Sequence, residues 1–327
     1  MKSLLTEDML MMRIAWLYYN QGLTQREIGD QLNLSRIKVL RYLAKARRQG
    51  VIQIRLVSPL FNCLAIEGKV KEVFNLKDVM VVPTPKERDG LRKALGLAGA
   101  VYLDKLLKPN MSLGTTWGST VYEVGINLEL KQWPEFRVVQ MVGGLAKSGI
   151  GINAFDIAKN IADALGGQCI YLQAPLLTDT SDTRAVLLKE SAVQRTLALA
   201  RTVDVALVGL GTVSNESPLV KSGFIDSLQL DILRTRGAVG DTLGRYFDIH
   251  GNAVDSELND RIIGLDLEDL RKIKCVTAVA GGPDKIETIL GGLRGGFIDV
   301  LITDEQTAQS VLDIEGAGLH PALNGGR

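Results

Sequence analysis

The chain has 327 residues, which is longer than one ordinary domain and suits two. Of these residues 46% are hydrophobic and 23% charged, a composition typical of a globular protein. No apolar run reaches the roughly 18 residues of a membrane-spanning helix, and Glu7 and Asp8 stand where a signal peptide would be apolar, so we expect a cytoplasmic protein that does not contact membranes. Two histidines and three widely spaced cysteines argue against a metal centre or a disulfide framework, and no cofactor is expected.

Charge is distributed unevenly along the chain. Residues 1–76 contain 12 Lys or Arg and 6 Asp or Glu, whereas the remainder contains 26 and 31. Between residues 31 and 66 there is no acidic residue. A basic segment at one end of an otherwise acidic chain predicts a polyanionic partner for that end alone.

The first helices of the chain are predicted from apolar spacing and capping residues. Apolar residues recur at helical spacing from Met9 to Tyr19, and Gly22 is the expected stop. Thr24 and Glu27 have the spacing of a capping box, in which each side chain satisfies the other residue's backbone N–H. A second, short helix is therefore expected to begin here.

A third helix follows after a turn centred on Asn33, a residue type that tolerates left-handed backbone geometry. Ser35 is the expected N-cap, Gly50 the expected end, and the predicted buried face consists of Val39, Leu40 and Leu43. The run from Val51 to Val57 reads as a strand. Helix, short helix, turn, helix and strand together predict a winged helix-turn-helix in residues 1–58.

In a helix-turn-helix the second helix enters the major groove of DNA, where its first residues reach base edges. Arg36 and Lys38 are the predicted base contacts, because arginine's planar fork matches two acceptors on guanine. Phosphate contacts position the protein without reading sequence. The full set of predicted DNA-binding residues is Thr24, Gln25, Ser35, Arg36, Lys38, Arg41, Tyr42, Lys45 and Arg47. A solvated basic helix, or a winged helix used for protein contacts, is the alternative interpretation.

The rest of the chain alternates short apolar runs with amphipathic helices. A linking helix is expected within residues 59–76, from about Leu64 to Phe74. Buried strands are predicted at 78–82, 111–114, 137–142, 168–172, 203–209, 274–280 and 297–302. Helices are predicted at 91–107, 119–128, 153–165, 191–201, 284–293 and 304–312. This alternation predicts a mostly parallel sheet covered by helices on both faces, in residues 77–315, followed by a flexible tail at 316–327.

Glycine-containing turns follow four of the predicted strands. Small residues let backbone N–H groups approach an anion, and ligands of parallel sheets bind at the carboxyl ends of the strands. The candidate ligand residues in these turns are Gly114, Thr115, Thr116, Trp117, Gly118, Ser119, Thr120, Gly143, Gly144, Gly209, Gly211 and Gly282. A single glycine of this kind more often makes a tight turn, so the argument depends on their recurrence.

Two charged residues add to this candidate effector site. Lys285 is expected in the first turn of a helix, where its charge opposes the helix dipole unless an anion binds beside it. Asp241 follows a glycine-rich turn and would accept hydrogen bonds from sugar hydroxyls. The alternative for both residues is simple solvent exposure.

With these residues in place, the chain resembles the sorbitol-operon regulator (SorC) family, which includes the deoxyribonucleoside, central glycolytic and autoinducer-2 regulators. The resemblance covers nearly the whole chain. It rests on 13–19, 22–25, 28–29, 32–36 and 50–52 in the first domain, and on 114–118, 208–211, 237–241, 280–282 and 303–304 in the second.

The resemblance implies a Rossmann-like effector domain, assembly into a homodimer or homotetramer, and an effector that is a sugar or sugar phosphate. It further implies that residues 114–120 hold the phosphate, while Asp241 and Lys285 contact the sugar. One branch of the family uses a lysine for a Schiff base, and whether Lys285 makes a covalent or only a polar contact stays open.

The expected function is a transcription regulator that binds operator DNA and responds to this effector. The alternative is a sugar-phosphate isomerase or deaminase with a DNA-binding appendage. Such an enzyme needs a base within reach of the substrate carbon, and no Asp, Glu or His cluster accompanies the glycine turns. The sequence therefore favours a regulator over an enzyme.

Overall fold

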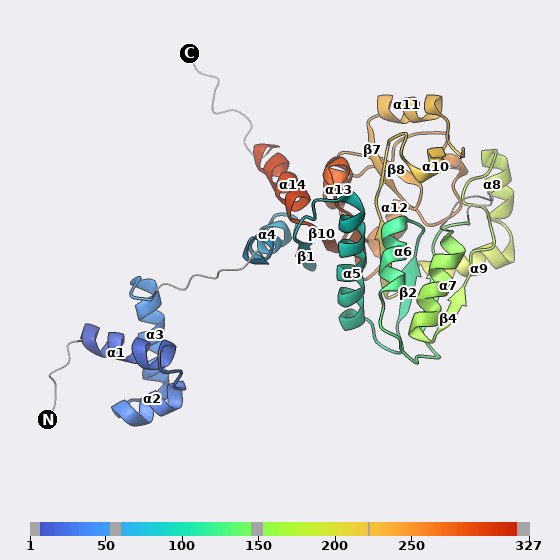
Figure 1. Cartoon of the computed structure of the whole chain (residues 1–327). Helices are drawn as coiled ribbons and strands as arrows, with labels where there is room; N and C mark the ends of the chain where they lie inside the picture. The colour runs from blue at the N-terminus through green and yellow to red at the C-terminus, as the bar shows by residue number, and fades with distance from the viewer. Residues whose placement is uncertain (1–6, 53–59, 145–152, 222, 319–327) are drawn as a thin grey trace, which may run out of the picture. The chain divides into compact units, whose positions relative to one another are not determined.

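The computed structural model describes residues 7–52, 60–144, 153–221 and 223–318 (Figure 1). The chain divides into two compact units, residues 1–58 and residues 59–327. Within the described ranges, no helix combines the length and the apolar character that a bilayer crossing requires.

The first unit consists of three helices, α1 (Glu7–Tyr19), α2 (Gln25–Leu32) and α3 (Arg36–Arg48). The predicted caps are confirmed, because Thr24 and Glu27 form a reciprocal capping box and the Ser35 side chain accepts from the N–H of Lys38. One small apolar core holds the helices together. Its buried members are Ile14, Leu17, Ile28, Val39 and Leu43.

The turn between α2 and α3 depends on one left-handed residue and on one close approach to α2. Asn33 is left-handed, with φ 54° and ψ 45°, as expected. A Cβ on Gly29 would lie 2.7 Å from the carbonyl oxygen of Leu34, so only glycine lets the turn approach α2 this closely.

The prediction of a buried residue at one position of α3 is wrong. Leu40 is 52% exposed, whereas Ala46 is buried beside Val39 and Leu43. The buried stripe runs at i, i+4 and i+7, and Leu40 is rotated by about 100° from Val39 on this helix. Of the strand predicted at 51–57, residues 51 and 52 form a bend, and the part from residue 53 onward lies outside the described residues.

The second unit is built on a seven-stranded sheet in the order β1-β10-β9-β5-β2-β3-β4, with all its strand pairs parallel. Its strands are β1 (Asp78–Val82), β2 (Ser112–Thr115), β3 (Arg137–Gln140), β4 (Gln168–Ile170), β5 (Val205–Gly209), β9 (Val276–Val279) and β10 (Val300–Asp304). The predicted strand positions agree with these bounds to within three residues at each end. The fold class predicted from the sequence is confirmed.

Helices cover both faces of this sheet, as buried parallel strands require. One apolar cluster joins one face to α5 (Arg88–Leu106), α6 (Ser119–Ile126) and α7 (Ala154–Leu165). These three helices are shown together in Figure 1. A second cluster joins the other face to α4 (Leu60–Val73), α9 (Ser191–Ala200), α13 (Ile286–Arg294) and α14 (Glu305–Gly318).

Two segments differ from the sequence-based expectation. The helix expected to link the domains, α4, packs against β1 and α14 and is therefore part of the second unit. Residues 316–318, expected in the tail, continue α14, and the rest of the tail lies outside the described residues.

A small antiparallel sheet, which the sequence pattern did not predict, packs onto the second unit. Its strands are β6 (Gly211–Thr212), β7 (Ala238–Thr242) and β8 (Arg245–Asp248), in that order. The accompanying helices are α8 (Ser181–Leu187), α10 (Pro218–Lys221), α11 (Ser227–Thr235) and α12 (Leu267–Lys272), with 3-10 turns at Asn259–Arg261 and Pro283–Lys285. This sheet holds Asp241 in its middle strand.

Candidate functional site

The start of α3 presents a row of polar and basic side chains to solvent. Ser35 caps the helix, and Arg36, Lys38 and Arg41 are all exposed. The Nε of Arg36 donates to Oε1 of Gln25 at 3.5 Å, which joins the first residues of α3 and α2. The residues predicted to contact bases are therefore accessible and lie on one helix.

Two of the predicted phosphate contacts already have partners on α1. The Nζ of Lys45 lies 2.6 Å from Oε1 of Glu7, and this hydrogen bond raises the pKa of Lys45. The guanidinium of Arg47 donates to the hydroxyl of Tyr19, with its Nε at 2.8 Å, and also lies over the Tyr19 ring. Both side chains are thereby held against α1. Tyr42 is half-buried and packs beside the core.

In the second unit, the four predicted glycine turns follow four adjacent strands, in the spatial order β9, β5, β2 and β3. Because these strands are parallel, their carboxyl ends meet at one edge of the sheet. Chain order reverses between β5 and β2, since β3 and β4 continue to one side and β9 and β10 to the other. Such a switch point is the usual place for a ligand in an open parallel sheet.

The turn from β2 into α6 lies at this switch point. Gly118 is the N-cap of α6 with φ 142°, a value that side chains rarely adopt, and it supplies no side-chain cap. The first turn of an α-helix has N–H groups without helical acceptors. In the described part of the chain, those at the start of α6 have no cap, which suits an anion. Thr116 is buried, and its hydroxyl donates to the carbonyl of Trp117 at 3.2 Å.

Packing explains some of the predicted glycines. A Cβ on Gly114 would lie 2.5 Å from Sδ of Met141, and one on Gly143 would lie 2.3 Å from the carbonyl oxygen of Pro175. The N–H of Gly143 donates to Ile263 and that of Gly144 to Ala174, both at 2.9 Å. These two amides are therefore bonded within the protein already.

Gly209 is different, because its nearest neighbour would be an ordinary contact at 3.4 Å with Val121. Space beside Gly209 is therefore not filled as tightly as beside Gly114 and Gly143. At Gly211, a Cβ would lie 1.8 Å from Oδ1 of Asp241, so glycine here is required for the carboxylate to sit against the turn after β5.

Asp241 and Lys285 meet beside this turn. Asp241 is only 5% exposed, which excludes the surface alternative, and burial raises its pKa to about 6, opposed by the charge of Lys285. Lys285 ends a 3-10 turn directly before α13, and its Nζ donates to the carbonyl of Leu210 at 2.5 Å. The structure thus brings together a carboxylate and an ammonium that are 44 residues apart in sequence.

Asp304, at the end of β10, supports the turn that precedes Lys285 and was not among the predicted site residues. Its Oδ1 accepts from the N–H of Gly282 at 2.9 Å, and its Oδ2 accepts from the Thr84 hydroxyl at 2.7 Å. Thr307 donates to it from both its hydroxyl and its N–H. The sequence signal that could have marked it is its place in 303–304, one of the motifs on which the family resemblance rests.

Comparisons with known proteins agree with this architecture. Residues 58–313 match a family described as "Putative sugar-binding domain", and residues 17–53 match a family described as winged helix-turn-helix DNA-binding. The deoxyribonucleoside regulator of Bacillus subtilis is 33% identical to this chain over 309 residues. The aligned region covers 94% of this chain and 98% of the regulator. The transcriptional regulator LsrR of Escherichia coli K12 is 33% identical over 310 residues, covering 94% and 95%.

Among solved structures, the full-length sorbitol operon regulator SorC of Klebsiella pneumoniae superposes with a TM-score of 0.72 at 27% identity, covering 94% of this chain and 99% of its own. The matched regions include the helix-turn-helix, the seven-stranded sheet and the turns at its carboxyl edge. This chain therefore belongs to the SorC family of sugar-responsive transcription regulators.

Proposed function

We propose that the protein regulates transcription of a carbohydrate-utilisation operon by binding operator DNA with its first unit and a sugar or sugar-phosphate effector with its second. The observation that carries the proposal is that the chain has both features. The first unit contains an exposed, basic α3, and the second unit contains α6, which has no side-chain cap and begins at the switch point of a parallel sheet. We assign DNA binding to residues 1–58 and effector binding to residues 77–315, with α4 and the end of α14 included in the second unit. DNA binding requires a cytoplasmic location, and the proposal includes no catalytic step.

On DNA, we assign base reading to Arg36 and Lys38, since both are exposed at the start of α3. Ser35 and Arg41 extend this surface, and the remaining predicted residues hold phosphates. Lys45 and Arg47 would then exchange their partners on α1 for phosphate oxygens. Glu7 opposes this exchange on any duplex, because its carboxylate already neutralises Lys45.

In the second unit, we assign the anionic group of the effector to the start of α6, where Gly118, Ser119 and Thr120 present backbone N–H groups and hydroxyls. Lys285 and Asp241 would face the remaining polar groups of the same ligand, because they lie beside the turn after β5. An ammonium and a carboxylate that are close together can donate to and accept from sugar hydroxyls at once.

We further propose that effector and DNA are linked through a homodimer or homotetramer. If each ligand prefers a different arrangement of the oligomer, each changes the affinity for the other by the same factor. Two recognition helices of a dimer would meet two half-sites about one helical turn of DNA apart.

The test is a thermal-shift screen of the full chain against sugars, polyols and their phosphates, followed by operator binding with each compound that raises the melting temperature. A ligand that binds only the native state stabilises it by mass action. We expect at least one sugar or sugar phosphate to stabilise the protein and to change operator affinity. Constant DNA affinity with every stabilising compound would refute linkage, and salt-independent DNA binding would refute the DNA-binding role.

A further inference from the structure

A polar pocket lies in the second unit, and its lining includes no residue of the four glycine turns. It has a volume of about 290 Å³ and is lined by residues of α8, β8, the segment 253–260 and the start of α12. None of its lining residues belongs to the predicted effector site. Its two cationic residues are Arg184, from α8, and Arg245, from β8.

Arg245 is a buried guanidinium whose partners are neutral. It is 6% exposed and donates to three backbone carbonyls, those of Leu265 at 3.4 Å, Ile262 at 3.2 Å and Asn259. Arg184 donates through Nε to the same Ile262 carbonyl at 2.7 Å. In the described ranges, neither arginine has a carboxylate within ion-pair distance. Each guanidinium carries five N–H donors, so these bonds leave donors on both.

The electrostatics agree with a positive charge that is only partly compensated. Burial and, after it, the neighbouring charge of Arg184 lower the pKa of Arg245 to about 10, while the carboxylates of Asp266, Asp260 and Asp269 act against this shift. Arg245 still carries its charge near neutral pH. A buried charge that lacks a paired partner is unfavourable, and an anion from solution would relieve it.

The pocket also has acidic residues, but these are placed differently from the arginines. Asp266 is committed to the N-cap of α12, accepting from the N–H of Asp269 at 2.8 Å. Asp255 and Asp260 are exposed. Arg245 is therefore buried and Arg184 half-buried, whereas the three carboxylates are exposed at the rim, where they would accept hydrogen bonds and would repel a multiply charged anion.

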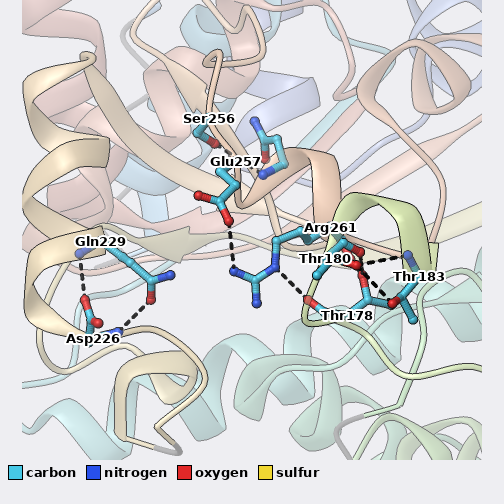
Figure 2. Close-up of polar contacts among 9 residues, drawn as sticks. Thr178, Thr180, Thr183, Asp226, Gln229, Ser256, Glu257 and Arg261 are labelled. Carbon is cyan, nitrogen blue, oxygen red and sulfur yellow. Dashed lines mark hydrogen bonds and ion pairs between the residues drawn. The ribbon is translucent and has the colours of Figure 1, made fainter. Parts of the chain in front are cut away.

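Polar contacts connect the segments next to the pocket, and Figure 2 shows those of Arg261 and Thr180. The Nε of Arg261 donates to the carbonyl of Thr178 at 2.6 Å, and its Nη1 lies 3.7 Å from Oε1 of Glu257. Thr180 caps α8 by accepting from the N–H of Thr183 at 3.1 Å. These contacts tie the start of α8, the helix that carries Arg184, to the 3-10 turn at Asn259–Arg261.

We propose that this pocket binds a small carboxylate whose other polar groups are hydrogen-bond donors, such as a hydroxy acid or an amino acid. The planar guanidinium forks of Arg184 and Arg245 match a carboxylate, and the acidic rim takes the hydroxyl or ammonium groups. This site is additional to the sugar effector site.

A chain of hydrogen bonds connects the pocket to the candidate effector site. Both arginines hold the carbonyl of Ile262, and the carbonyl of the next residue, Ile263, accepts from the N–H of Gly143 at 2.9 Å. Gly143 follows β3, in one of the four glycine turns at the carboxyl edge of the sheet. A bound carboxylate that shifts the two guanidinium groups would therefore also shift the backbone at Ile262 and Ile263, and with it the turn at Gly143.

The experiment measures binding of gluconate and serine to the full chain by calorimetry, with acetate, sorbitol and inorganic phosphate as comparison compounds. Arg184→Gln is the test variant, because Arg245 also holds three carbonyls and its loss would disturb the fold. Arg195→Gln, at an exposed position of α9, is the matched control. Arg184→Lys keeps the charge without the planar fork. Circular dichroism of each variant confirms that it is folded.

We expect gluconate or serine to bind the wild type more tightly than acetate or sorbitol, and Arg184→Gln to weaken that binding by about tenfold or more, a loss of at least 1.4 kcal/mol. Arg184→Lys should be intermediate and Arg195→Gln unchanged. Absence of binding to the wild type, or equal binding by Arg184→Gln, overturns the proposal. Binding that Lys285→Met abolishes but Arg184→Gln retains belongs to the effector site and also overturns it. Tighter binding of phosphate than of both carboxylates refutes the assigned ligand class.

Discussion

The ammonium of Lys285 donates a hydrogen bond to the carbonyl oxygen of Leu210, at 2.5 Å, and so joins the start of α13 to the turn after β5. This contact fixes a positive charge beside the buried Asp241 at the edge of the sheet where the chain order reverses. The predicted role of Lys285 depends on this placement.

Replacing Lys285 should weaken phosphorylated effectors selectively. Lys285→Met removes a charged donor, and hydrogen bonds to charged groups contribute about 1.5–3 kcal/mol, which corresponds to about 10- to 100-fold in affinity. Unphosphorylated sugars should lose less. The measurement is calorimetric titration of whichever sugar phosphate stabilises the wild type. Lys159→Met, on the exposed surface of α7, is the control, and equal affinities of both variants would contradict the assignment.

Asp241 should make the stability of the protein depend on pH. Burial raises its pKa from 3.8 to about 6, so the folded state favours the protonated form. This favourable contribution is complete below pH 3.8 and is lost as the pH rises through about 6. The change is on the order of 3 kcal/mol, because one pKa unit corresponds to about 1.4 kcal/mol.

The measurement compares the free energy of unfolding of wild type and Asp241→Asn between pH 4 and pH 8. Asparagine stays neutral, so the wild type should lose stability relative to the variant as the pH rises to about 6, and the difference should then level off. Asp179→Asn, at an exposed position, should show no such trend. A constant difference between wild type and Asp241→Asn across this range would contradict the raised pKa.

Base contacts and phosphate contacts on α3 should be separable by their effects on DNA binding. Arg36→Ala should lower the preference for operator over random duplex, since a bidentate base contact contributes about 1–3 kcal/mol of discrimination. Lys45→Ala should weaken both duplexes alike and reduce the salt slope by about one. Fluorescence anisotropy over a salt series measures both quantities. If Arg36→Ala weakened both duplexes equally, its assignment to bases would be wrong.

Gly29→Ala should damage DNA binding through the turn. The added Cβ would lie 2.7 Å from the carbonyl oxygen of Leu34, so the turn before Ser35 must shift, at about 1–3 kcal/mol. Gly68→Ala is the matched control, because it lies in α4 and a Cβ there meets no atom within 4 Å. It should instead stabilise the second unit by about 0.5–1 kcal/mol. Operator affinity and thermal unfolding of both variants are the readouts, and normal DNA binding by Gly29→Ala would refute the close approach.

Much of the architecture could be predicted because local interactions determine it. The capping box of Thr24 and Glu27, the left-handed Asn33 and the cap at Ser35 each involve residues within a few positions of one another. Buried parallel strands are apolar on both faces, so β1 and β5 were recognisable as continuous apolar runs. The small antiparallel sheet was missed because β6 has two residues and β7 contains glycine and aspartate.

The sequence alone determined the helix caps, the alternation of strands and helices, and the segregation of positive charge to one end of the chain. These depend on side chains that are neighbours along the backbone. Only the tertiary structure decided that Asp241 is buried beside Lys285, that Asp304 supports the Gly282 turn, and that Arg184 and Arg245 line one pocket. Each of these pairs is brought together by strand order and packing, which no local pattern records.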